Sequence, residues 1–75
     1  MSRVIDGRGM VPPEPLELAL AALPALGEGE QLTVLVYCQP HPLFAALSEA
    51  GFQWTEEVAA DGTHAVHIRR ASIVA

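Results

Sequence analysis

Cysteine is almost absent from this sequence, in which Cys38 is the single example. One cysteine excludes an internal disulfide bond, and no Cys-x-x-Cys or Cys/His spacing typical of a structural zinc site occurs. These absences predict a reducing compartment. They also lead us to assign neither a metal nor a cofactor to the chain.

Basic side chains are scarce as well, because four Lys or Arg stand against nine Asp or Glu, for a formal net charge of -5. So few cations argue against nucleic-acid binding, which needs positive charge along the phosphate backbone. The partners that remain are a protein or a small anionic molecule. No apolar run approaches the ~20 residues of a membrane span, and the first residues lack an apolar signal region. We therefore expect a cytoplasmic protein without a membrane partner.

Apolar residues, in contrast, are plentiful. They make up 51% of the 75 residues, and the mean hydropathy is +0.30. This length lies near the lower limit at which one hydrophobic core suffices without disulfides or metals. We expect a single domain, residues 1–75.

The hydrophobic spacing in the first half predicts a strand, a helix and a second strand. The first strand is Arg3–Asp6, and leucines at helical spacing begin after Glu14 and continue until Pro24 and Gly27 end the helix. The second strand, Leu32–Tyr37, is apolar on both faces, which is typical of a strand covered on both sides or lying centrally. A right-handed crossover makes the two strands parallel and places the helix on one face of their sheet.

The second half predicts a helix followed by a hairpin. The helix His41–Ala50 begins among prolines and ends before Gly51, which is placed to adopt the left-handed conformation. In the hairpin, parity favours a three-residue turn with a left-handed Gly62, because an odd turn pairs Trp54 with Ile68 on one apolar face, with Trp54 in the core. The fold class is therefore α/β, an α+β two-layer sandwich in the order β-α-β-α-β-β. It has a four-stranded mixed sheet with two helices on one face.

The loop after the first strand resembles a known family motif. Asp6 to Pro15 reads DGRGMVPPEP, which resembles the D-x-R-G-x-x-C-P-x-P signature of the TusA/SirA-like sulfur carriers. Pro12 stands where the carriers hold their persulfide cysteine. The chain also resembles an uncharacterised sister family with P-P-E-P at this corner and Pro-x-Pro-Leu after the central strand, matched here by residues 40–43. The resemblance implies the same two-layer fold and no established activity, and Pro12 favours a protein that is not an enzyme.

Parallel neighbouring strands deliver the loops that follow them to the same edge of the sheet, where open α/β proteins bind ligands. The loops after the first and second strands should therefore meet in one rim. This rim would hold a carboxylate, a guanidinium, a thiol, an imidazole and the positive ends of both helices. We predict a ligand-binding or partner-binding site there, formed by Asp6, Arg8, Pro12, Pro13, Glu14, Cys38 and His41.

Each of these residues also has a plainer interpretation. Cys38 is either a thiol activated by the second helix and by His41, or a small buried residue at a strand end. His41 is a base or an ordinary surface residue of a first helical turn. Asp6 and Arg8 form an anion clamp, or Asp6 bonds the N–H groups of its own loop. The prolines hold a ligand or set the angle at which the helix begins.

The remaining polar residues of the hairpin predict no site. His64 and His67 lie at odd separation and face opposite sides of the sheet, which excludes a metal pair. Glu56 and Glu57 are adjacent and also face opposite sides, which disfavours a paired-carboxylate acid/base site. Arg69-Arg70 is typical of a solvated strand end.

Three functions are compatible with these patterns. The first is a non-catalytic TusA/SirA-like module that binds a protein partner or small ligand at the rim. The second is a sulfur-transfer or redox relay that uses Cys38, the one candidate for a catalytic residue. The third is a structural interaction domain that self-associates through the open face of the sheet or an edge strand such as Ala71–Ala75.

Overall fold

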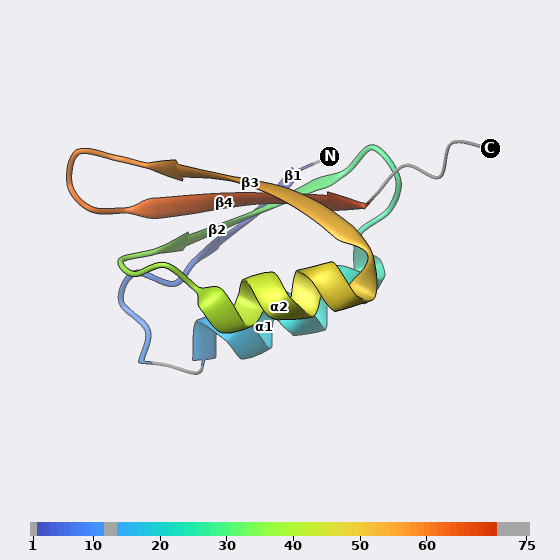
Figure 1. Ribbon diagram of the computed structural model, residues 1–75, viewed down its shortest axis with the longest axis horizontal. Coiled ribbons are helices and arrows are strands. Elements are labelled where there is room, and N and C mark those ends of the chain that lie inside the picture. Colours follow the sequence, from blue (N-terminus) through green and yellow to red (C-terminus); the bar gives the residue numbers. More distant parts are fainter. Residues whose placement is uncertain (1, 12–13, 71–75) are drawn as a thin grey trace.

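The computed structural model describes residues 2–11 and 14–70, and its elements follow the expected order (Figure 1). The bounds are β1 (Ser2–Asp6), α1 (Glu14–Ala22), the 3₁₀ turn η1 (Leu23–Ala25), β2 (Gln31–Val36), α2 (His41–Ala50), β3 (Phe52–Val58) and β4 (His64–Arg70). The proposed edge strand 71–75 lies outside the described residues.

The four strands form one mixed sheet in the order β1-β2-β4-β3. β1 and β2 run parallel, whereas β4 is antiparallel to both β2 and β3. Both helices lie on the same face of the sheet (Figure 1). The α/β two-layer prediction is therefore confirmed, and β2 is apolar because it lies centrally, not because helices cover both of its faces.

Local sequence explains where the helices end. Pro24 lacks an N–H and cannot continue an α-helix, so the chain tightens into η1 after Ala22. α2 has the bounds that the sequence predicts, and Gly51 ends it at φ +82°, donating its N–H to the carbonyl oxygens of Leu47 and Ser48. This left-handed conformation carries no steric penalty for glycine.

The hairpin register is also as predicted, since Trp54 pairs with Ile68. Ala59 N–H donates to the Thr63 carbonyl at 2.8 Å, and Gly62 N–H donates to the Ala59 carbonyl at 3.0 Å. Gly62 has φ +91°. The turn proper is therefore residues 60–62 with a left-handed glycine, which places the apolar stripes of both strands on one face.

The core lies between the helices and the sheet. Its largest fully enclosed side chains come from α2 and from the helix-facing sides of β2 and β4: Leu32, Val34, Leu43, Leu47, Val66 and Ile68, each at 1% exposure or less. Phe44 of α2 stacks on Trp54 of β3 with ring centroids 5.4 Å apart, so Trp54 packs against the core from its edge. Burial on one face only explains the alternation in β3 and β4.

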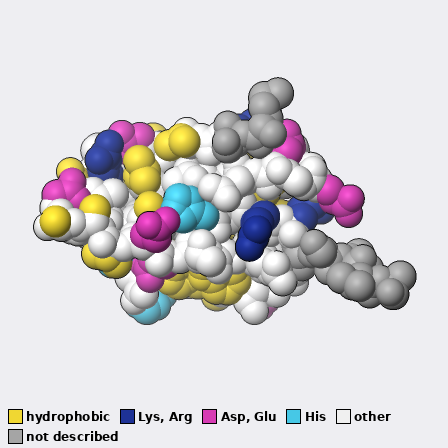
Figure 2. All heavy atoms as spheres, turned by 90° about the horizontal axis from the view of Figure 1, so that it is seen from above, with side chains coloured by type: hydrophobic (Ala, Val, Ile, Leu, Met, Phe, Trp, Pro, Cys, Tyr) yellow, Lys and Arg dark blue, Asp and Glu magenta, His cyan; other side chains and the backbone are white. Residues whose placement is uncertain are grey.

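Within the described part of the chain, no helix covers the opposite face of the sheet. Seen from this side, acidic, basic and histidine side chains are dispersed across the surface (Figure 2). Thr33 of β2 lies directly opposite His67 of β4 in the ladder, and Thr55 of β3 lies beside His67 in turn. Polar residues are typical of a face that no helix covers, although Thr33 itself is only 9% exposed between its neighbours.

Candidate functional site

The corner between β1 and α1 depends on a close backbone approach at Gly7. Its N–H donates to the Leu35 carbonyl at 2.7 Å, which extends the parallel ladder one residue beyond β1. A Cβ at Gly7 would lie 2.9 Å from Pro15 Cβ, closer than real contacts allow. The missing side chain therefore lets the first turn of α1 pack directly against the end of the sheet.

The loop after β2 is built by prolines. Pro40 is the N-cap residue of α2, at φ -86° and ψ 73°, and its carbonyl accepts a hydrogen bond from Phe44 N–H at 3.1 Å. His41 N–H donates to the Gln39 carbonyl at 3.0 Å. Pro42 follows in the first helical turn, where its lack of an N–H costs nothing.

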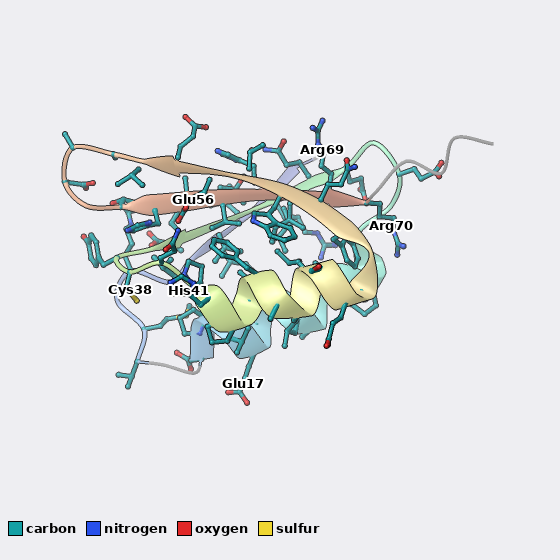
Figure 3. The ribbon with its side chains drawn as sticks, viewed as in Figure 1. Glu17, Cys38, His41, Glu56, Arg69 and Arg70 are labelled. Atoms are coloured by element: carbon teal, nitrogen blue, oxygen red, sulfur yellow. The ribbon has the colours of Figure 1, made fainter. Side chains whose placement is uncertain are left out.

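Between this loop and the first turn of α1 lies an apolar pocket of about 200 Å³. It opens at the end of the molecule where α2 begins, and Cys38 and His41 are seen at this end in Figure 3. The wall is formed almost entirely by aliphatic and proline carbon atoms: Pro15, Leu16, Val36, Cys38, Gln39, Pro40, Pro42 and Leu43. The pocket therefore has the chemistry of a site for an apolar group.

Asp6 and Arg8 form a bidentate pair rather than an open clamp. Arg8 Nε donates to Asp6 Oδ1 and Nη2 donates to Oδ2, both at 2.9 Å, and the Arg8 backbone N–H also donates to Oδ1 at 3.2 Å. These hydrogen bonds lower the pKa of Asp6 to about 2 and raise that of Arg8 above its ordinary value. Both charges are thus engaged within their own loop, which corresponds to the plainer interpretation of Asp6.

The expected common rim is divided between the two faces of the sheet. Both loops emerge at the same end, since β1 and β2 are parallel and Asp6 pairs with Leu35. Cys38, however, lines the pocket beside the helices, whereas Arg8 lines a shallow groove with Glu57 and residues of the hairpin on the uncovered face. The single rim of the sequence prediction is therefore replaced by two separate depressions.

The other predicted site residues are placed as follows. Cys38 is exposed, which corrects the interpretation of it as a buried strand-end residue. His41 is exposed in the first turn of α2, where its ring meets the Phe44 ring edge-on at 6.3 Å. Glu14 is exposed at the start of α1. Pro12 and Pro13 lie outside the described residues.

A polar cluster that the sequence analysis missed lies beside the pocket. The Glu56 carboxylate accepts hydrogen bonds from Gln39 Nε2 at 2.9 Å and from His64 Nδ1 at 2.8 Å. These bonds, with the His64 bond the stronger influence, lower the pKa of Glu56. A signal was present in the sequence: parity places Glu56 and His64 on the helix-facing side of the hairpin, where both side chains are partly shielded from water and a partner within the protein is favoured.

A second glutamate–histidine pair lies on the uncovered face. His67 Nε2 donates to Glu57 Oε1 at 2.8 Å, while His67 Nδ1 lies 3.0 Å from Thr33 Oγ1 and 3.2 Å from Gln31 Nε2. A carboxylate only accepts, so the neutral ring carries its hydrogen on Nε2 and accepts at Nδ1. All the ring's hydrogen-bonding capacity is therefore used within the sheet.

Metal ligation finds no support in the described part of the chain. No group of three or more His, Cys, Asp or Glu is arranged to hold an ion there. Within residues 2–11 and 14–70, no helix combines the length and apolar character needed to cross a membrane.

Comparisons with known proteins place this geometry in a class. The chain is 32% identical to a SirA-like protein from Desulfitobacterium hafniense of known crystal structure, with a TM-score of 0.78, and the match covers 88% of this chain and 93% of that one. The fold is thus that of a SirA-like domain. A family model described as "Uncharacterized conserved protein (DUF2249)" matches residues 4–70, so the chain belongs to that family. The comparison with curated proteins finds no match.

Proposed function

We propose that this chain is a non-catalytic binding module whose pocket beside α1 and α2 receives one apolar side chain of a protein partner. The proposal includes a cytoplasmic location, because the single cysteine leaves no internal disulfide. It also includes membership of the branch with P-P-E-P in place of the sulfur carriers' cysteine motif. Proline at position 12 removes the thiol on which sulfur transfer at that corner depends.

The composition of the pocket wall is the observation that carries this proposal. Proline rings from both helix starts, Pro15, Pro40 and Pro42, face the space together with Leu16 and Leu43. Prolines offer no N–H, so the helix ends that would otherwise attract an anion present few donors here. Such a wall favours a hydrocarbon group over the small anionic molecule that was the other partner considered.

The volume of the pocket supports the same choice. Pockets for drug-sized ligands are about 300–1,000 Å³. An apolar cavity of about 150 Å³ is already enough for one benzene molecule. At about 200 Å³, this pocket suits a single ring or branched aliphatic side chain, presented by a larger partner that contacts the surrounding surface.

A titration of the ¹⁵N,¹³C-labelled protein tests the proposal. The probes are N-acetyl-phenylalaninamide, N-acetyl-leucinamide, N-acetyl-aspartamide and inorganic phosphate. We expect the first two to shift the methyl signals of Leu16, Val36 and Leu43, and the charged probes to leave them unchanged. Shifts with phosphate alone would favour a small anion, and shifts confined to the uncovered face or an edge strand would favour a structural interaction domain.

The sulfur-transfer or redox relay stays as a second candidate because the Cys38 thiol is exposed and lines the pocket. Cys38 lies in the loop between β2 and α2, and His41 follows three positions later. The rate at which iodoacetamide labels Cys38 between pH 5 and 9 tests this function. A relay thiol reacts fast with a midpoint below the ordinary value near 8.5, whereas a slow thiol with an ordinary midpoint excludes the relay.

A further inference from the structure

We propose that Glu56 is a positioning residue for the pocket, because it ties Gln39 in the pocket wall to His64 of the hairpin and so sets the place of the loop after β2. The effect of Glu56 on affinity for an apolar group rests on the proposed binding function. The structural part of the inference, the tie itself, is tested without any ligand.

The carboxylate joins three separate parts of the chain. Glu56 lies within β3, His64 begins β4, and Gln39 belongs to the loop between β2 and α2. Each oxygen of Glu56 has its own donor, Oε1 from Gln39 and Oε2 from His64. The side chains of Glu56 and His64 are each 20% exposed, so water competes only partly for the hydrogen bond between them, whereas the bond from Gln39 lies at the surface.

The two anchors of this tie differ in rigidity. Glu56 and His64 belong to strands paired along their whole length, from Phe52↔Arg70 to Val58↔His64. Gln39 belongs to a bend in the loop. The backbone of this bend is held by a local hydrogen bond, which His41 N–H donates to the Gln39 carbonyl. The hairpin is therefore the rigid part of this contact, and the Glu56 carboxylate fixes the position of the loop relative to it.

Gln39 connects the tie to the pocket because it is itself part of the wall, between Cys38 and Pro40. Figure 3 shows Glu56 on the strand above the loop that carries Cys38 and leads to His41. Two residues before Glu56, the stack of Trp54 on Phe44 holds α2 against the same strand. β3 therefore positions both sides of the pocket mouth, the loop through Glu56 and the helix through Trp54.

The groups that act on Glu56 come from three elements. His64 of β4 and Gln39 of the loop donate to it, and His41 of α2 acts through its charge. All three favour the ionised carboxylate and lower its pKa. The tie is thus complete above the ordinary glutamate value of 4.5 and is lost only as the pH falls below that value.

Three variants test the tie. Glu56→Ala removes the acceptor for both donors, whereas Glu56→Gln keeps a neutral amide that still bonds His64 and a reoriented Gln39. Glu57→Ala is the matched control, since Glu57 is the adjacent residue of β3, also pairs with a histidine, and faces away from the loop. The measurements are the side-chain amide signal of Gln39 from pH 3 to 7, hydrogen exchange of the loop amides, and the affinity for N-acetyl-phenylalaninamide.

We expect the Gln39 amide signal of the wild type and of Glu57→Ala to shift with a midpoint below 4.5, and that of Glu56→Gln to show no such step. Loop exchange should speed up in Glu56→Ala alone. Affinity for the probe should fall about three- to tenfold in Glu56→Ala, which is the effect expected from losing the one hydrogen bond that reaches the loop, and it should recover in Glu56→Gln.

Each failure has a distinct meaning. A Gln39 signal and loop exchange that are the same in Glu56→Ala as in the wild type overturn the positioning role, whatever the probe does. If these readouts change as expected but the probe binds to none of the proteins, the tie stands and the binding function fails. Should Glu56→Ala not fold, the missing pH step in Glu56→Gln still decides the question.

Discussion

The two faces of the sheet carry the same pair of residue types in different surroundings. On the helix side, Glu56 pairs with His64 and both are largely covered, whereas on the uncovered side Glu57 pairs with His67 and Glu57 is 75% exposed. Glu56 also reaches the loop of the pocket through Gln39. The His67 pair extends instead along the sheet to Thr33, within the strands themselves.

This difference shows that the pleat of a strand gives adjacent residues different surroundings and therefore different roles. Adjacent positions of a strand point to opposite faces, so two consecutive glutamates with the same chemistry meet different neighbours. The covered one joins an irregular loop to a rigid ladder, which is a means of positioning a site. The exposed glutamate, Glu57, pairs with a histidine on the surface of the regular sheet and faces away from the loop of the pocket.

The largest effect on stability is expected from two consecutive residues of β4, which compare the two faces of the sheet. Ile68 is fully buried on the helix side, and Arg69 is exposed and points to the other side, as seen in Figure 3. We expect Ile68→Ala to lower the free energy of unfolding by about 2–5 kcal/mol, because it leaves a cavity in the core. Arg69→Ala should change it by less than about 0.5 kcal/mol. Equal effects in urea denaturation would contradict the one-sided core.

The next largest effect on stability is expected at the corner between β1 and α1. Gly7→Ala places a methyl group 2.9 Å from Pro15 Cβ and 3.1 Å from the Leu35 carbonyl oxygen. We expect a loss of about 1–3 kcal/mol from this overpacking, measured by thermal or urea unfolding. Gly9→Ala is the control, since nothing lies within 4 Å of its added Cβ. A Gly7 variant as stable as the Gly9 variant would mean that α1 does not pack at this corner.

Substitution of Glu56 and of Glu57 compares the two faces of the sheet at adjacent positions of β3. At pH 7, Glu56→Ala should cost about 1–2 kcal/mol because it breaks two hydrogen bonds to a charged group in a largely covered site. Glu57→Ala should cost less than about 0.5 kcal/mol, as expected for an exposed pair.

The pH dependence gives the sign of this effect. The folded-state pKa of Glu56 is lowered, so its stabilisation is present above 4.5 and disappears as the pH falls through the lower folded value. The stability difference between the wild type and Glu56→Ala should therefore narrow below pH 4.5. A difference that stays constant on acidification would exclude the ionised carboxylate as its source.

The smallest effect concerns the loop after β1. In the wild type, the Asp6 carboxyl should titrate at about 2, because Arg8 stabilises its ionised form. Arg8→Gln should raise this value toward 3.8, as followed by ¹³C NMR of the carboxyl carbon. Arg3→Gln is the control, since Arg3 donates no hydrogen bond to Asp6 in the described structure. An unchanged Asp6 titration in Arg8→Gln would show that the pair does not persist in solution.

Much of the fold follows from the sequence because its signals are local. The bounds of α2, the left-handed Gly51 and Gly62, and the pairing of Trp54 with Ile68 were all predicted from spacing, turn residues and parity. The handedness of the first crossover predicted that α1 lies on one face of the sheet, and the simplest arrangement, in which α2 joins it there, gave the two layers. These features depend on residues close together in the chain or on a periodicity of two, which a sequence displays directly.

The candidate site was predicted less well, for a physical reason. The topology placed the loops of Arg8 and Cys38 at one end, but the side of the sheet that each would occupy depends on how the chain leaves the last strand residue. The pocket residues Pro15 and Leu43 are ordinary helix residues when considered singly. Their convergence arises from packing between α1 and α2, which no local pattern encodes.

The sequence by itself determined the order of the two α-helices and four strands, the buried stripe of the hairpin and the absence of a thiol at position 12, since all of these are set by residue identity and local backbone preference. Only the tertiary structure decided that Arg8 turns to Asp6, that prolines of two helices enclose a small apolar space, and that Glu56 reaches Gln39 across seventeen positions. Contacts of this kind depend on distances between distant segments, which are settled only when the helices pack on the sheet.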